Sequence, residues 1–311
     1  MKYSIKKAAG FTLIELMITV LLSLMITFAI SKILITSNQS ASTSDGLSQA
    51  QETGRFVMSF LAGHIRKAGL DSIVDLSSPI IPPEIISLPF IDCDTYPSLK
   101  NYGGGAGDDA CSNHTTGGAK AAEGATGSTP ATAATFNGGD HLAVSWVSDK
   151  DSNRDCTGAG GYAKDDTILN VFWVQPPTLV DPTDSNSVGT SGSLWCQGFT
   201  FNNSIIATVN GNSSQSIANG IDAMHILYGE ATGDLAGEDG VRNVTRYVTA
   251  NNVNQWDHVY AVRVAILSSA PAGSGDSEES IYQLLDSELY TINDNITRQV
   301  FSATFVIRNY K

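Results

Sequence analysis

The chain of 311 residues is acidic: 18 Lys and Arg stand against 31 Asp and Glu, which gives a formal net charge of −13. This balance argues against duplex DNA or RNA as the main partner, because phosphate binding depends on basic side chains. Hydrophobic residues make up 42% of the chain and charged residues 16%, so most of it can fold around a core. The length suits one large domain or two modest ones.

A basic leader precedes a long apolar segment. Residues 2–7 contain three lysines, and the 21 residues 11–31 contain Glu15 as their only charge. A helix of that length spans about 30 Å, the thickness of a hydrocarbon core. The lysines predict that the N-terminus stays in the cytoplasm and that the rest of the chain is translocated. A secretory signal peptide is the alternative, but no small-residue cleavage site follows the apolar run.

Glu15 is the unusual residue of this segment. A carboxylate at membrane depth costs about 2.5–3.5 kcal/mol on insertion scales and persists only with a partner. No Lys or Arg lies between residues 8 and 31, so the partner comes from another chain or from an amine made by cleavage nearby. The alternative is that Glu15, near the start of the helix, reaches the membrane interface.

The sequence Lys6-Lys-Ala-Ala-Gly10 followed by Phe11-Thr-Leu-Ile-Glu15 resembles the class III leader and first helix of type IV pilins. The resemblance implies that a prepilin peptidase and methyltransferase cuts after Gly10 and N-methylates Phe11. It also implies that Glu15 pairs with a Phe N-terminal amine as subunits pack into a filament. Residues 1–10 are then a leader peptide, and no cofactor is implied.

An amphipathic helix is predicted after the apolar segment. Apolar or small residues recur at three- and four-residue steps from Leu47 to Ala68, which predicts one buried stripe. We therefore expect one long helix over 11–70, with a cap or bend near Thr43–Asp45, and a periplasmic head over 71–311.

The head is predicted to be mostly strands. Residues 101–139 are dominated by Gly, Ala, Ser and Thr, which predicts a long surface loop. Short runs rich in aromatic and β-branched residues follow and predict strands. The fold class is α+β: a long helix packed on a largely antiparallel sheet. The strands are expected at 141–147, 167–174, 194–201, 221–228, 259–267 and 299–308.

Four cysteines are expected to form disulfides, because the head would lie in an oxidising periplasm. Three connectivities are open, and proximity in the sequence favours Cys93–Cys111 and Cys156–Cys196. No motif predicts a metal centre or an enzyme: the five histidines are scattered, and nucleophile-elbow, zinc-protease and phosphate-loop patterns are absent from the sequence.

A calcium loop is a weaker alternative. Asp149, Asp151, Asn153 and Asp155 are spaced like the start of an EF-hand loop. Arg154 replaces the glycine of the turn, however, and Gly160 stands where a bidentate Glu is needed. A solvated acidic turn is the favoured interpretation.

Several segments resemble PilW-type minor pilins, a family of low-abundance pilus subunits. They lie at 51–56, 61–69, 220–229, 246–248, 259–267 and 298–309. The resemblance implies initiation of type IV pilus assembly in a tip complex, and roles in twitching motility and adhesion. The implied partners are other minor pilins, the inner-membrane assembly platform and a large tip adhesin, and the implied locations are the inner membrane and then the pilus. The alternatives are a J-type minor pseudopilin of a type II secretion system and a membrane-anchored periplasmic binding or calcium-binding module.

Overall fold

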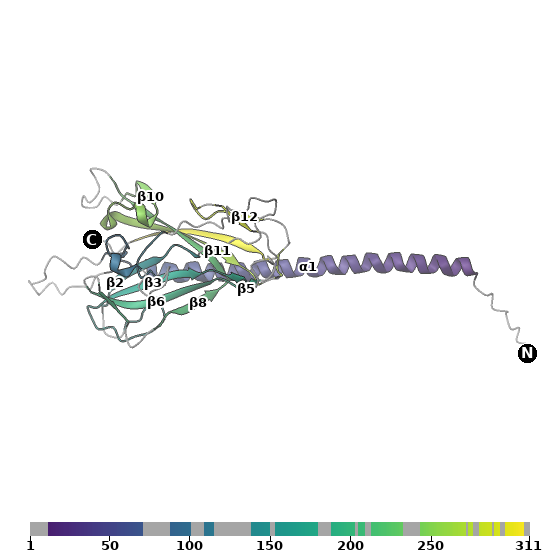
Figure 1. The fold of residues 1–311 in the computed structure, drawn as a ribbon, viewed down its shortest axis with the longest axis horizontal. Coiled ribbons are helices and arrows are strands. Elements are labelled where there is room, and N and C mark those ends of the chain that lie inside the picture. Colours follow the sequence, from purple (N-terminus) through teal and green to yellow (C-terminus); the bar gives the residue numbers. More distant parts are fainter. Residues whose placement is uncertain are drawn as a thin grey trace, which may run out of the picture.

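Figure 1 shows the computed structural model of the chain, a head from which one long helix projects towards the N-terminus. The structure describes residues 12–70, 88–100, 109–114, 138–149, 153–179, 188–202, 205–208, 213–232, 243–271, 273–275, 280–287, 289–292 and 296–307.

The helix α1 covers Leu13–Ile65, 53 residues or about 80 Å at 1.5 Å per residue. It begins after Thr12, which caps it, and the chain turns at Gly69, whose φ of 69° lies in the left-handed region. The amide of Gly69 donates to the carbonyl of Ser145, so the end of the helix is joined to the head. The helix runs through Thr43–Asp45 without interruption, so the break expected there does not occur.

Fourteen strands belong to the described residues, and three short 3-10 helices accompany them. They are β1 (Gly138–Gly139), β2 (Leu142–Val147), β3 (Thr167–Gln175), β4 (Thr178–Leu179), β5 (Val188–Thr190), β6 (Ser193–Asn202), β7 (Ile205–Ala207), β8 (Gln215–Asn219), β9 (Ile221–Glu230), β10 (Arg246–Val248), β11 (Val259–Ser269), β12 (Ser280–Tyr282), β13 (Tyr290–Ile292) and β14 (Arg298–Val306), with η1 (Pro97–Leu99), η3 (Ala250–Asn252) and η4 (Trp256–His258).

Two five-stranded sheets form the head. Sheet I has the order β1-β9-β11-β14 with β10 beside β9, and sheet II has the order β2-β3-β6-β7 with β8 beside β6. All pairings in them are antiparallel except that of β1 with β9. The six strands expected from the sequence are β2, β3, β6, β9, β11 and β14, so the α+β class is confirmed, with two main sheets instead of one.

Side-chain alternation places one face of sheet I against α1. Val262, Val264 and Ile266 of β11 join the main hydrophobic cluster with Phe305 of β14, as a period of two requires. The register shifts between Val259 and Ala261, and such a bulge reverses the alternation. Val259 therefore takes the cluster position that the pattern assigned to Tyr260.

The second half of α1 is part of the core. Its stripe of Ala50, Gly54, Val57, Leu61 and Ile65 is buried, as the periodicity predicted, but Leu47 at the start of the predicted stripe is exposed and Gly46 is buried instead. The main cluster joins this stripe to inner residues of both sheets. The other face of sheet I is covered by the β12–β13 hairpin, and the other face of sheet II by the segment that contains η1.

Gly54 sets how closely α1 approaches β14. A Cβ atom at this position would overlap the ring of Phe301, whereas a Cβ at Gly63, on the same helix, would meet no atom within 4 Å. The contact between helix and sheet therefore depends on the missing side chain at residue 54 and not on glycine in general.

We predict opposite effects for the same substitution at these two glycines. Gly63→Ala should stabilise the protein by about 0.5–1 kcal/mol, because alanine restricts the unfolded chain. Gly54→Ala should destabilise it by roughly 1–3 kcal/mol through overpacking. Thermal unfolding followed by circular dichroism tests both, and equal shifts of the two variants would contradict the role given to Phe301.

His64 gives the head a pH dependence. Burial, aided by Lys67, lowers the pKa of His64 from 6.5 to about 4. The Nδ2 of Asn170 lies 3.3 Å from its Nδ1, and a protonated ring cannot accept that hydrogen bond. Because the unfolded chain binds the proton at higher pH than the folded one, stability is retained above pH 6.5 and falls as the pH drops towards 4.

We therefore predict that His64→Leu flattens the unfolding profile between pH 6.5 and 4. The wild-type chain should lose up to about 3 kcal/mol over this range from His64 alone. Denaturant unfolding at half-unit pH steps measures the difference between the two proteins. A difference that stays constant with pH would rule out titration of His64 as the cause.

Candidate functional site

The first turn of α1 carries Glu15. The amide of Glu15 donates to the Thr12 hydroxyl at 3.3 Å, and Thr-x-x-Glu is the sequence of a capping box. The carboxylate also lies at the positive end of the helix dipole. Within the described residues no cation pairs with it. Gly10 and Phe11 lie outside the described residues, so the predicted cleavage and N-methylation stay predictions.

The first half of α1 has no packing partner in the described part of its own chain. Its large apolar side chains are all more than half exposed, and α1 is the one described helix that is long and apolar enough to cross a membrane. Its hydroxyl groups bond back to carbonyls one turn earlier, so they need no water. The exposed side chains are Leu13, Ile14, Leu16, Met17, Ile18, Val20, Leu21, Leu22, Leu24, Met25, Ile26, Phe28, Ile30, Ile33, Leu34 and Ile35, and the hydroxyls are those of Thr19, Ser23, Thr27, Ser31 and Thr36.

Both disulfides have the pairing that sequence proximity favoured. Cys93 bonds to Cys111, and Cys156 bonds to Cys196 on β6. The first disulfide is itself part of the hydrophobic cluster on the face of sheet II that points away from α1. It also anchors the segment 109–114, whose last residue is His114.

Of the candidate calcium residues, the structure describes Asp149, Asn153 and Asp155, and each of them has hydrogen-bond partners nearby in the chain. Asp155 is buried, and its carboxylate accepts hydrogen bonds from Thr157, Ala159 and Tyr162. The amide of Asn153 donates to Asp149, and Asp151 lies outside the described residues. The contacts of Asp155 are those of a carboxylate that organises its loop.

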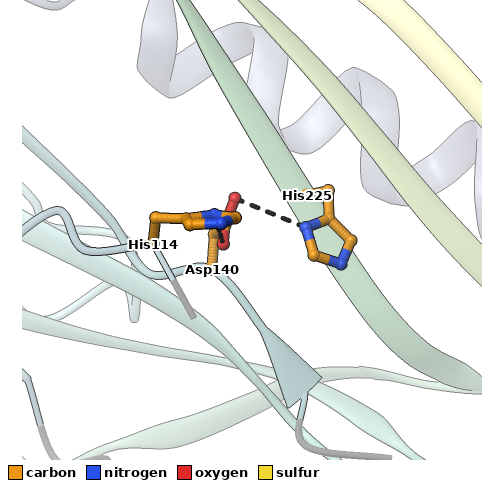
Figure 2. Close-up of side chains that lie close together, drawn as sticks. All are labelled: His114, Asp140 and His225. Atoms are coloured by element: carbon orange, nitrogen blue, oxygen red, sulfur yellow. Dashed lines mark hydrogen bonds and ion pairs between the residues drawn. The ribbon is translucent and has the colours of Figure 1, made fainter. Parts of the chain in front are cut away.

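Figure 2 shows a different group of converging side chains: His114, Asp140 and His225. His114 Nδ1 lies 2.9 Å from Asp140 Oδ1, and His225 Nδ1 lies 3.6 Å from Asp140 Oδ2. One potential ligand atom from each of the three lies within 4.8 Å of the others. No other group of three or more His, Cys, Asp or Glu among the described residues converges in this way.

The backbone brings Asp140 next to His225. Gly138 and Gly139 of β1 pair in parallel with Ala223 and Met224 of β9, so the residue after β1 lies beside the residue after Met224. The amide of Asp140 donates to the Met224 carbonyl, and the amide of Ile226 donates to Asp140 Oδ2 at 2.7 Å. Both glycines have positive φ, and a Cβ at Gly139 would collide with the Met224 carbonyl. The close pairing therefore requires glycine.

The electrostatics of the group favour an ionised aspartate. Burial alone would raise the pKa of Asp140, but the hydrogen bond with His114 and the nearby ring of His225 outweigh burial and hold the pKa below the ordinary value. The same hydrogen bond to Asp140 raises the pKa of His114. A buried negative charge is thus held between two imidazole rings.

Sequence reasoning missed this group. His114 and Asp140 are 26 residues apart, with the low-complexity segment between them, and His225 lies on a distant strand. No motif spacing connects the three residues. The available signals were two glycines before Asp140 and a single histidine in a mostly apolar strand, and neither indicates a partner.

Two family models match the chain. Residues 5–31 match the prokaryotic N-terminal methylation motif, and residues 183–309 match the family described as Type IV Pilus-assembly protein W. Searches of curated proteins and of solved structures find no match. The second matched region contains β9, β11 and β14 of sheet I, with His225, whereas His114 and Asp140 precede it.

The first match includes most of the exposed apolar part of α1, and the second covers most of the sheet on which the other half of the helix packs. The chain is therefore a type IV pilin-like protein, a minor pilin with a class III signal.

Proposed function

We propose that this minor pilin helps to initiate type IV pilus assembly as part of a complex at the pilus tip, and so contributes to twitching motility and adhesion. The observation that carries the proposal is the match of residues 183–309 to the pilus-assembly family. The exposed apolar half of α1 supports it independently. We assign the protein a structural role and no enzymatic activity.

The unpacked half of α1 explains why the protein needs an assembly. Exposed apolar surface costs roughly 25 cal/mol per Å² in water, so a row of sixteen large apolar side chains requires lipid or the helices of other subunits. We place this half in the inner membrane first, with the head in the periplasm. On assembly it moves into the filament core among other pilus subunits.

Glu15 favours the movement of this half of α1 from the membrane into the filament. In the membrane its carboxylate is costly, whereas beside an amine in a filament both buried charges are compensated. We infer that the prepilin peptidase cuts after Gly10 and methylates Phe11, and that the new amine of a neighbouring subunit pairs with Glu15. The exposure of Glu15 at the start of α1 leaves its side chain free to be reached by another chain.

The size of the head favours a position at one end of the filament. Subunits of the shaft repeat at close spacing, and two sheets with long connections are easier to place where nothing stacks above them. The partners in this proposal are other minor pilins, the inner-membrane assembly platform and a large tip adhesin.

Deletion of the gene tests the function against its nearest alternative. We expect surface pili and twitching to fall by at least tenfold, with secreted enzymes unchanged. Electron microscopy counts the pili, stab-agar assays measure twitching, and culture supernatants report secretion. Lost secretion with normal pili would instead identify a J-type pseudopilin. Loss of neither would leave the anchored binding module.

Substitutions at Glu15 separate its charge from its role in the capping box. Gln satisfies a capping box as Glu does, but it carries no charge. If the charge docks the subunit, Glu15→Gln should reduce the protein in sheared filaments at least tenfold while cleavage of the leader stays normal. Immunoblots of sheared filaments and of whole cells measure the two quantities.

Two variants control this experiment. Gly10→Val should leave uncleaved precursor and so marks its position on the gel, whereas Thr12→Ala removes the cap but keeps the charge. Normal incorporation of Glu15→Gln together with a defect in Thr12→Ala would show that the residue acts through the cap.

A further inference from the structure

We propose that His114, Asp140 and His225 bind one divalent transition-metal ion, with Zn²⁺ preferred, and leave a fourth coordination position for water or another donor. This site does not depend on the role in pilus assembly. Two imidazole nitrogens and one carboxylate oxygen are a donor set that zinc takes in proteins. Calcium and magnesium favour sites made of oxygens alone.

The distances within the group are compatible with coordination of one ion by all three residues. Ligand atoms about 2.0–2.1 Å from a tetrahedral ion are about 3.3 Å from one another. His114 Nδ1 lies 2.9 Å from Asp140 Oδ1 and His225 Nδ1 lies 3.6 Å from Asp140 Oδ2, and one potential ligand atom from each residue lies within 4.8 Å of the others. The 3.6 Å gap between His225 Nδ1 and Asp140 Oδ2 is too long for a hydrogen bond, but an ion between them closes it.

Further contacts orient the ligands from behind. The hydroxyl of Tyr290, which is itself buried, lies 2.7 Å from His225 Nε2. The amide of Ile226 donates to Asp140 Oδ2. A metal-binding histidine usually hydrogen-bonds through its other nitrogen, which fixes the ring and directs the lone pair to the ion. When Tyr290 accepts from Nε2–H, the Nδ1 lone pair of His225 points at Asp140, an arrangement that a cation stabilises.

The three ligands are held by elements that are fixed separately. His225 lies within β9, and Asp140 follows β1 in a pairing that two glycines make possible. The main chain of His114 forms hydrogen bonds in both directions with the side chain of Asn251. The Cys93–Cys111 bond anchors the segment that carries His114. Such preorganisation reduces the entropy lost when an ion binds.

The exposure of the three side chains and the charge around them also suit the binding of a cation. The side chains of Asp140 and His225 are 3% and 2% exposed, whereas that of His114 is 18% exposed. An ion therefore enters from the side of His114, where Asp286 adds negative potential. Bound to two neutral imidazoles and one carboxylate, a divalent ion leaves one positive charge, which a fourth ligand or the acidic surroundings can offset.

The site would join two positions of the chain that flank residues 115–137. His114 is the last described residue before this segment, and Asp140 lies just after it. Both are outside the region matched by the pilus-assembly family, and His225 is inside it. The ion would thus link a part of the chain outside the matched region to a strand inside it.

Zinc binding to the full-length, untagged protein in detergent tests the proposal. The protein is stripped with EDTA, titrated with ZnCl₂ by calorimetry, and its metal content is measured after gel filtration. We expect one zinc per chain, no calcium at this site, and at least a tenfold weaker affinity for His114→Gln. Cobalt in place of zinc should give the intense visible bands of four-coordinate Co²⁺, and these should be lost in the variant.

Control variants make the outcome decisive. His114 is partly exposed, so its substitution should leave the fold intact, which the unfolding midpoint of the metal-free protein verifies. His258→Gln, a histidine outside the group, should bind zinc as the wild type does. Wild-type protein without bound zinc, or His114→Gln with unchanged affinity, would overturn the proposal and leave a hydrogen-bonded triad without metal.

Discussion

The structure depends on one continuous helix that must satisfy two environments. The backbone of α1 is hydrogen-bonded along its whole length, and its hydroxyls bond back to its own carbonyls, so between residues 13 and 36 only the charged side chains of Glu15 and Lys32 still need a polar partner. The second half is buried in the head. No break separates the two halves. The position of the first half, in the membrane or in a filament, therefore determines the position of the head.

Besides the apolar side chains of the main cluster, a glycine and a polar bond shape the contact between α1 and sheet I. Gly54 accommodates the ring of Phe301, and the Ser268 hydroxyl donates to the Ala50 carbonyl at 2.9 Å. Beside this contact, the buried pair of Arg298 and Asp222 connects β14 to β9. Removing one partner of such a pair is costly. These contacts make the helix and the sheet one unit, so force on the helix is transmitted to the head.

Periodic patterns made most of the fold predictable from the sequence. The apolar run, the stripe from Ala50 to Ile65 and the alternation in β11 and β14 each reflect a single repeating contact with one surface. The pairing of Gly138 and Gly139 with β9 was not predictable, because two glycines have no side chains to form a pattern. The second sheet was missed since strand runs alone do not say which strands pair.

The candidate site was unpredictable for the same reason. Its three residues share no period and no spacing, and they meet only because β1 enters the sheet in parallel beside β9. Taken separately, Asp140 and His225 are two polar residues in a core. Burying either one would destabilise the fold unless the two side chains compensate each other. Their burial beside each other in the folded chain is therefore informative, whereas their positions in the sequence were not: sheet I packs against α1 on one face, and His225 and Asp140 meet at its other face.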